Sequence, residues 1–260
     1  KRFFYNYYSF TNLHSKLKIL KIIITNMTNI SINSYIKFLK NIGIYSFLQD
    51  QPNNYFNINN NKRLNKNLAR IEDIKSIEDL KSHIKNSEIC NLKKTAINSV
   101  IGDGNENANI MLIGEAPGAE EDKVGKPFVG AAGILLNKML NAIDLKREDI
   151  YITNIIPWRP PNNRTPTNDE ILQCLPFVQK IIEIVKPNLI LLLGATSAKA
   201  ILNSNLSIAK LRGEWHEYQS INHKEKINCL VTYHPAFLLR SPNYKKESWK
   251  DLQEFQRNFQ

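Results

Sequence analysis

The chain has 260 residues, of which 42% are hydrophobic and 23% charged, as in ordinary globular proteins. Its net charge of +11 suggests a nucleic-acid partner, but residues 1–70 carry 11 Lys and Arg against a single acid, Asp50. The rest of the chain is close to neutral, so charge alone does not make it a DNA binder. Three cysteines are too few for a disulfide framework, which fits a reducing, cytoplasmic compartment.

The first 70 residues are predicted to be a basic, Asn-rich N-terminal extension and linker that is partly disordered. Residues 32–48 have the apolar spacing of a helix, and 51–67 form a low-complexity Asn-rich stretch. A targeting peptide over 1–26 is disfavoured by its Asn, Lys and Tyr content, and Met27 is an alternative start. No apolar run is long enough to cross a bilayer, so no membrane association is expected.

The folded domain is predicted over 71–260. Ser76 to Asp79 reads as a capping box that opens a helix ending near Ser87, and Thr167 to Glu170 reads as another. Short apolar runs alternate with helical stretches from residue 108 onward. The predicted strands cover 108–114, 150–157, 188–194 and 227–233, and the helices 131–143, 168–186, 195–203 and 245–258.

This alternation predicts an α/β fold of three αβα layers around a mainly parallel, central four-stranded sheet. The loops that leave the strands' carboxyl ends then meet at one edge of the sheet, where such folds bind ligands. The loop after the first strand is unusually rich in glycine, which lets a ligand approach the main chain closely. Its glycines are Gly114, Gly118, Gly125, Gly130 and Gly133.

Three motifs converge on this edge. They are GEAPGAEED with GKPFVG, then Asn154 ahead of RPPNNR, and finally HPAFLLR from His234. In this order they resemble the uracil-DNA glycosylase superfamily, most closely its family 4 of bacteria and archaea. The resemblance covers about residues 85–258 and includes the LRGEW stretch at 211–215.

The resemblance implies a pocket for a uracil flipped out of DNA. His234 matches the residue that stabilises negative charge on the leaving base, and Asn154 matches the residue that reads its amide edge. Phe128 matches the aromatic ring that stacks on the base, and the loop at Ala116 and Gly118 lends main-chain N–H groups. Each of these residues taken singly could have a purely structural role, and only their joint occurrence favours the site.

The group that handles the attacking water stays open at this level. Another branch of the superfamily has an Asp at the position of Ala116, whereas family 4 has a small residue there. The candidates are Glu115, Glu121 and Asp122, and the resemblance also makes Glu121 a guard against the thymine methyl group. A solvated acidic turn, or the start of a helix, is the alternative interpretation of 120–122.

The resemblance also implies DNA contacts from the loops beside the pocket, through Arg159, Asn163, Arg164, Arg240, Ser241 and Lys245. Phe237, Leu238 and Leu239 resemble the wedge that enters the duplex when a base flips out, and we assign Leu238 to DNA binding. The alternative for Leu238 and Leu239 is core packing.

Family 4 enzymes hold a 4Fe-4S cluster on four cysteines, and two of these positions differ here. Cys90 and Cys174 match cluster positions, whereas Lys93 and Trp158 stand where the family has cysteine. Two thiolates do not bind a cubane cluster in the usual way, and Cys229 lies in a strand elsewhere. We therefore predict no cluster, no metal and no cofactor, with Trp158 filling the space.

The predicted function is excision of uracil from single- or double-stranded DNA by a monomeric glycosylase that initiates base-excision repair. One alternative is a glycosylase for hypoxanthine or xanthine, or one that reacts with the abasic sugar through a histidine such as His216. Another is a non-catalytic module that binds damaged DNA.

Overall fold

The computed structural model describes residues 71–219 and 226–259. The predicted helix over 32–48, the linker over 51–67 and the extension over 1–70 lie outside the described residues. The domain boundary at residue 71 therefore stays a prediction.

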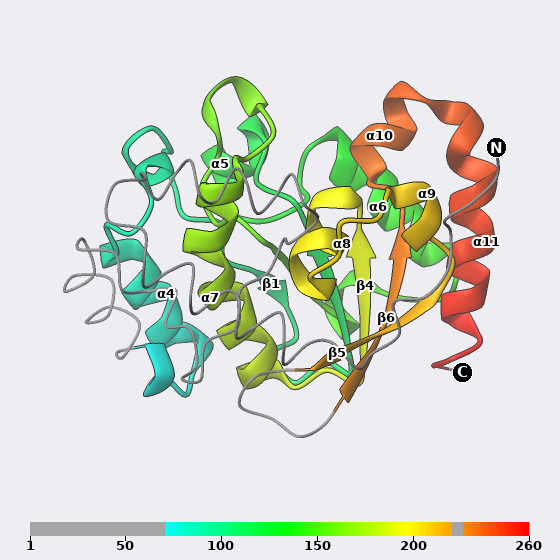
Figure 1. Cartoon of the computed structure of the whole chain (residues 1–260), viewed down its shortest axis with the longest axis horizontal. Helices are drawn as coiled ribbons and strands as arrows, with labels where there is room; N and C mark the ends of the chain where they lie inside the picture. The colour runs from blue at the N-terminus through cyan, green and yellow to red at the C-terminus, as the bar shows by residue number, and fades with distance from the viewer. Residues whose placement is uncertain (1–70, 220–225, 260) are drawn as a thin grey trace, which may run out of the picture. The chain divides into compact units, whose positions relative to one another are not determined.

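The core of the fold is a six-stranded sheet in the order β1-β3-β2-β4-β6-β5 (Figure 1). The predicted strands form its parallel centre: β2 (Ile110–Gly114), β3 (Tyr151–Asn154), β4 (Leu189–Leu193) and β6 (Lys226–Thr232). Two antiparallel edge strands that we did not predict, β1 (Asp103–Gly104) and β5 (Trp215–Gln219), complete it. Both are partly exposed, so neither shows the continuous apolar run of a buried strand.

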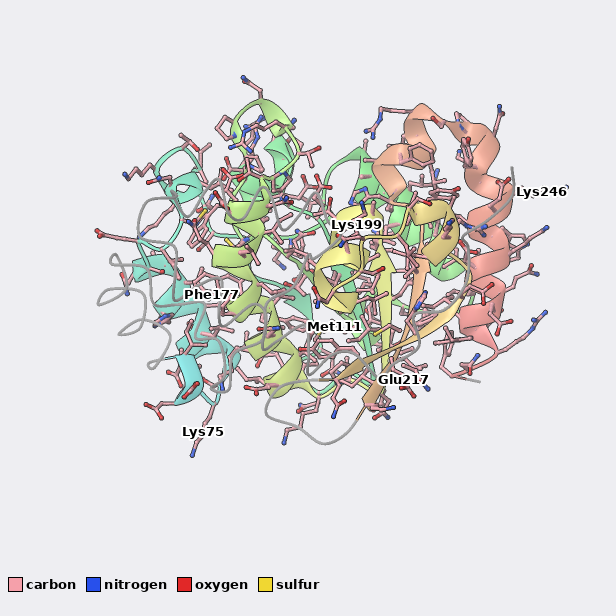
Figure 2. All side chains as sticks on the ribbon, viewed as in Figure 1. Lys75, Met111, Phe177, Lys199, Glu217 and Lys246 are labelled. Carbon is pink, nitrogen blue, oxygen red and sulfur yellow. The ribbon has the colours of Figure 1, made fainter. Side chains whose placement is uncertain are left out.

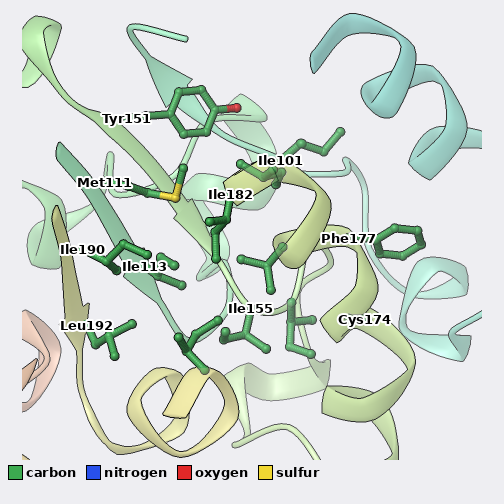
Figure 3. Packing of buried hydrophobic residues seen from close by; sticks show 14 of the residues in the cluster. Ile101, Met111, Ile113, Tyr151, Ile155, Cys174, Phe177, Ile182, Ile190 and Leu192 are labelled. Atoms are coloured by element: carbon green, nitrogen blue, oxygen red, sulfur yellow. The ribbon is translucent and has the colours of Figure 1, made fainter. Parts of the chain in front are cut away.

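Helices cover both faces of this sheet, which confirms the three-layer prediction (Figure 1). Alternate residues of β2 show this division: Met111 and Ile113 pack into one apolar cluster, seen in Figure 3, and Ile110 and Leu112 into the other. On the first face lie α4 (Ile77–Asn86), α7 (Asn168–Val185) and α8 (Ala195–Leu202); on the second lie α6 (Ala131–Asn141), α10 (Pro235–Arg240) and α11 (Lys245–Gln256).

The capping signals locate two of these helices correctly. The Ser76 hydroxyl accepts the N–H of Asp79 at the start of α4, and Thr167 and Glu170 form a reciprocal capping box on α7. The short helix α5 (Ala119–Val124) begins at the acidic segment 120–122, where a helix start was one of the alternatives, and the short helix α9 (Ile208–Leu211) was not predicted. No helix in the described ranges is long and apolar enough to span a membrane.

The strand order places a crevice at the carboxyl end of β2. In the sheet, β2 lies between β3 and β4. The chain reaches β3 from β2 through α6 on one face of the sheet, and it reaches β4 from β3 through α7 on the opposite face. The loops that leave the ends of β2 and β3 therefore run to opposite faces. Such a switch point is where open α/β sheets bind ligands.

A buried ion pair fixes the end of β6, from which the last motif departs. The Asp251 carboxylate on α11 is 1% exposed, and it accepts hydrogen bonds from Arg212 and from the Thr232 hydroxyl at 2.8 Å. Arg212 also donates to the main-chain oxygen of Glu247 at 2.8 Å. The Arg of the LRGEW stretch thus joins α9, β6 and α11, and burial raises the pKa of Asp251.

Removal of Asp251 should destabilise the fold strongly. Asp251→Ala leaves the Arg212 cation without its buried partner, and we expect the free energy of unfolding to fall by about 3–5 kcal/mol. The matched control is Glu217→Ala. It breaks the exposed ion pair between Glu217, on the edge strand β5 (Figure 2), and Lys226 on β6, and it should cost about 0–1 kcal/mol. Urea denaturation measures both, and equal losses would contradict the assignment.

Candidate active site

A cavity of about 390 Å³ opens at the carboxyl edge of the sheet, at the crevice beside β2. Most of the predicted site residues line it: Glu115, Ala116, Gly118, Glu121, Phe128, Asn154, Asn163, Arg164, His234 and Arg240. They come from four separate segments of the chain, which the parallel sheet brings to one edge. Arg159 and Leu238 do not line it.

Asn154, the last residue of β3, lines this cavity and carries an unpaired polar atom. Its side chain is buried, and its Oδ1 has no hydrogen-bond partner among the described residues. A buried acceptor left unpaired costs about 1–3 kcal/mol, so the site is built to receive a donor. Gly114 on the neighbouring strand makes room, since a Cβ there would lie 2.4 Å from Asn154 Oδ1 and 2.6 Å from Phe128 Cζ.

His234 caps α10 and is held as a neutral donor. The N–H of Ala236 donates to its Nδ1 at 3.1 Å, so the neutral ring carries its proton on Nε2. The pKa of His234 is lowered to about 4, mainly by burial and also by the Arg240 cation, while the Glu121 carboxylate opposes both effects. Its ring centroid lies 5.5 Å from that of Phe128.

Glu121 holds the loop that carries Phe128. Its Oε1 accepts the N–H groups of Val129 at 3.0 Å and Gly130 at 2.8 Å, and its Oε2 accepts that of Gly118 at 3.1 Å. These main-chain bonds engage both oxygens of the carboxylate. The geometry therefore gives Glu121 a role in shaping the loop, and whether it also handles water or excludes a methyl group stays a prediction.

Of the other two acidic candidates, Glu115 lines the cavity and Asp122 does not. Asp122 is buried outside the cavity lining and accepts the N–H groups of Ile97 and Asn98 at 2.9 and 3.0 Å. Glu115 lines the cavity, and the Thr196 hydroxyl donates to its Oε2. Of these carboxylates, Glu115 has the fewest hydrogen bonds to the protein.

The predicted DNA contacts receive uneven support from the structure. Arg164 makes a bidentate pair with Glu170 at 2.8 and 2.6 Å, so its charge is already compensated. Arg159 donates to Asn163 Oδ1 at 2.7 Å. Arg240 has no ion-pair partner within the described ranges, which leaves its charge available at the rim.

The assignment of Leu238 to DNA binding is wrong for this conformation. Its side chain is 1% exposed and packs in the apolar cluster beneath α10. The helix instead turns Leu239 outward, with 44% of it exposed. A run of adjacent leucines does not reveal which one faces the core. His216, named above for covalent chemistry, lies outside the cavity lining, with Nε2 2.9 Å from the Leu211 carbonyl oxygen.

Arg147 is a site-supporting residue that the sequence did not reveal. Its guanidinium donates to the carbonyl oxygens of Pro127 at 2.6 Å and Phe128 at 3.0 Å. In the sequence it stands in KRED, which looks like an ordinary solvated turn. No local signal distinguishes it.

The cysteine positions do not fit a four-thiolate cluster. Cys90 and Cys174 are buried and in thiol contact, and the hydrogen bond from Cys174 lowers the pKa of Cys90 to about 7. Trp158 is 1% exposed and packs edge-on against Phe177, with ring centroids 6.0 Å apart. Across the described ranges, no three His, Cys, Asp or Glu side chains are grouped so as to hold a metal ion.

Comparison with known proteins gives a consistent family. A model of the uracil DNA glycosylase superfamily matches residues 101–253. The chain is 43% identical over 174 residues to the type-4 uracil-DNA glycosylase of Pyrobaculum aerophilum, covering 66% of this chain and 89% of that protein. It is 42% identical over 159 residues to that of Thermotoga maritima, covering 61% and 80%. A type-5 uracil-DNA glycosylase of Pyrobaculum aerophilum is 28% identical over 153 residues.

His234 should stay neutral in the folded protein down to about pH 4. Long-range ¹H–¹⁵N NMR, with His234→Gln for assignment, should show a proton on Nε2 and none on Nδ1 at pH 6. Arg240→Ala should raise the pKa of His234, because it removes a nearby cation. The unfolded chain takes up this proton near pH 6.5, so His234 lowers stability as pH falls from about 6.5 to about 4. A ring already charged at pH 6 would contradict the assignment.

Proposed function

The chain belongs to the uracil-DNA glycosylase superfamily, and from this premise we propose that it excises uracil from DNA as the first step of base-excision repair. The relatives that are 42–43% identical to it are type-4 uracil-DNA glycosylases. The observation that carries the proposal is the buried, unpaired Oδ1 of Asn154, a residue that lines the same cavity as the neutral His234. Such a pair suits a base with an N–H to donate and an oxygen on which charge develops.

Recognition of the base rests on Asn154 and Phe128. Asn154 Oδ1 accepts the N3–H of uracil, whereas cytosine carries a lone pair at that position and would leave the amide oxygen unpaired. Phe128 stacks on the flipped base. A base inside a duplex cannot reach this cavity, so the nucleotide must leave the stack.

Catalysis rests on stabilising the leaving base. The bond between the sugar C1′ and uracil N1 breaks with its electron pair on the base, and the sugar becomes oxocarbenium-like. The Nε2–H of His234 donates to the uracil oxygen where this negative charge gathers. A water then adds to C1′ and loses a proton, which leaves free uracil and an abasic sugar.

We assign the positioning of this water to Glu115. It lines the cavity, and among the described residues its carboxylate accepts a hydrogen bond only from the Thr196 hydroxyl, at Oε2. Glu121 is the weaker candidate, because main-chain N–H groups already occupy both of its oxygens. The base-stabilising donor supplies most of the acceleration, so a strong general base is not required.

DNA is held around the rim of the cavity. We assign phosphate contacts to Arg240 and Asn163, which line the cavity, and the wedge role first given to Leu238 to the exposed Leu239. All of these groups come from one chain, so we expect a monomer to be active. Both single-stranded and duplex DNA are substrates under this proposal.

Loss of either recognition group should abolish most activity. His234→Ala and Asn154→Ala should each lower the single-turnover rate of uracil excision about 10²–10³-fold, the effect of removing one aligned polar group. Asn107→Ala, an exposed asparagine far from the cavity, is the control. Oligonucleotides with uracil, hypoxanthine or xanthine test the alternative substrates. Release of hypoxanthine or xanthine without release of uracil would show that the substrate is a deaminated purine and not uracil. Binding without any cleavage would favour a non-catalytic module.

We also infer that this chain works without a 4Fe-4S cluster. Only two of the four thiolates are present, and Trp158 is buried where another would stand. The packing of Trp158 on Phe177 and the contact of Cys90 with Cys174 support an apolar replacement for the cluster.

Trp158 should therefore be a stability residue. Trp158→Ala should lower the free energy of unfolding by about 3–5 kcal/mol, and Trp158→Phe by clearly less, because Ala leaves a larger cavity. Thermal and urea denaturation measure this. The purified protein should be colourless, and stoichiometric iron and sulfide would overturn the inference.

A further inference from the structure

We infer that Arg147 is a positioning residue that holds the stacking ring of Phe128 in the base pocket. The inference rests on the proposed function, because stacking matters only if a base enters. Arg147 does not line the cavity, so it acts through the main chain of the loop and not on the base.

All five N–H groups of Arg147 have acceptors. Nη1 donates to the Phe128 oxygen at 3.0 Å and to Asn137 Oδ1 at 3.3 Å. Nη2 donates to the Pro127 oxygen at 2.6 Å and to Asp103 Oδ2 at 3.2 Å, and Nε donates to the same Oδ2 at 3.3 Å. A guanidinium has five donors in a fixed plane, so this environment uses its whole capacity.

These bonds fix an unfavourable backbone conformation. Phe128 has φ of 52°, in the left-handed region that residues with a side chain avoid. The carbonyls of Pro127 and Phe128 stand on either side of the Phe128 Cα, so fixing both fixes its φ and ψ. Glu121 then accepts the next two N–H groups, at Val129 and Gly130.

The clamp is anchored away from the pocket. Asp103 belongs to the edge strand β1 and also pairs with Lys126 at 3.0 Å. Burial would raise the pKa of Asp103, but Lys126 and Arg147 outweigh this and hold it below its usual value. Gly133 packs against the same loop, since a Cβ there would lie 1.9 Å from the Phe128 oxygen. The ring of Phe128 is thus 5% exposed and faces His234.

A lysine does not reproduce this arrangement. Its ammonium is a point charge with three donors, and it cannot bridge two carbonyls and a carboxylate in one plane. Arg147→Lys keeps the charge beside Asp103 and so preserves the fold better than Arg147→Met. It should still loosen the loop.

The experiment is a double-mutant cycle on uracil excision by the full chain. Phe128→Ala and Arg147→Met should each lower kcat/KM about 5- to 150-fold, the range for loss of one base–aromatic stack, with Arg147→Lys in between. The double variant should be no worse than Phe128→Ala, because both changes remove the same interaction. Free uracil should inhibit each variant more weakly than the original chain. Arg257→Met, which removes an exposed arginine on a different helix, should stay within about twofold.

A second readout separates this inference from the proposed function. With ¹⁹F-labelled phenylalanine, and Phe128→Leu for assignment, Arg147→Met and Arg147→Lys should shift or broaden the Phe128 signal in folded protein. If the original chain excises no uracil, the proposed function fails, and the ¹⁹F signal still tests the clamp. An unchanged signal, or activity losses that add fully in the double variant, would overturn the role of Arg147.

Discussion

The carboxylate of Glu121 and the guanidinium of Arg147 hydrogen-bond to the main chain between Pro127 and Gly130, and the shape of the pocket depends on these bonds. Glu121 accepts N–H groups on one side, and Arg147 donates to carbonyl oxygens on the other. These hydrogen bonds offset the conformational cost of the positive φ at Phe128. These two charged side chains therefore hold the backbone, and Glu121 is also part of the cavity wall, together with Phe128, Asn154 and Gly118.

The state of His234 explains how the pocket can favour a leaving anion without a fixed cation at its centre. Burial keeps His234 neutral, and the Ala236 N–H fixes which nitrogen carries the proton. The low pKa means that the ring carries no extra proton near neutral pH, and a neutral imidazole does not readily give up its remaining N–H proton, so His234 acts as a hydrogen-bond donor. Its orientation is set before the base arrives, so no rearrangement is needed as charge develops.

The region around Cys90, Cys174 and Trp158 is buried and closely packed. Two thiols and a buried indole cannot replace the bonds of a metal cluster, but they can fill the same volume with apolar contacts. Nearby, the Arg164–Glu170 pair closes the capping box of α7 and lies at the rim of the pocket. Trp158 stands immediately before the segment of chain that carries Asn163 and Arg164.

Local periodicity and chain order were enough to predict the parallel strands, the caps at Ser76 and Thr167 and the convergence of three motifs. The outward position of Leu239 and the inward position of Leu238 became known from the folded structure. It also supplied the edge strands β1 and β5, the loop-holding role of Glu121 and the whole role of Arg147. Arg147 meets Asp103 across 44 positions of sequence. Such contacts arise from the closing of the fold, and no local pattern encodes them.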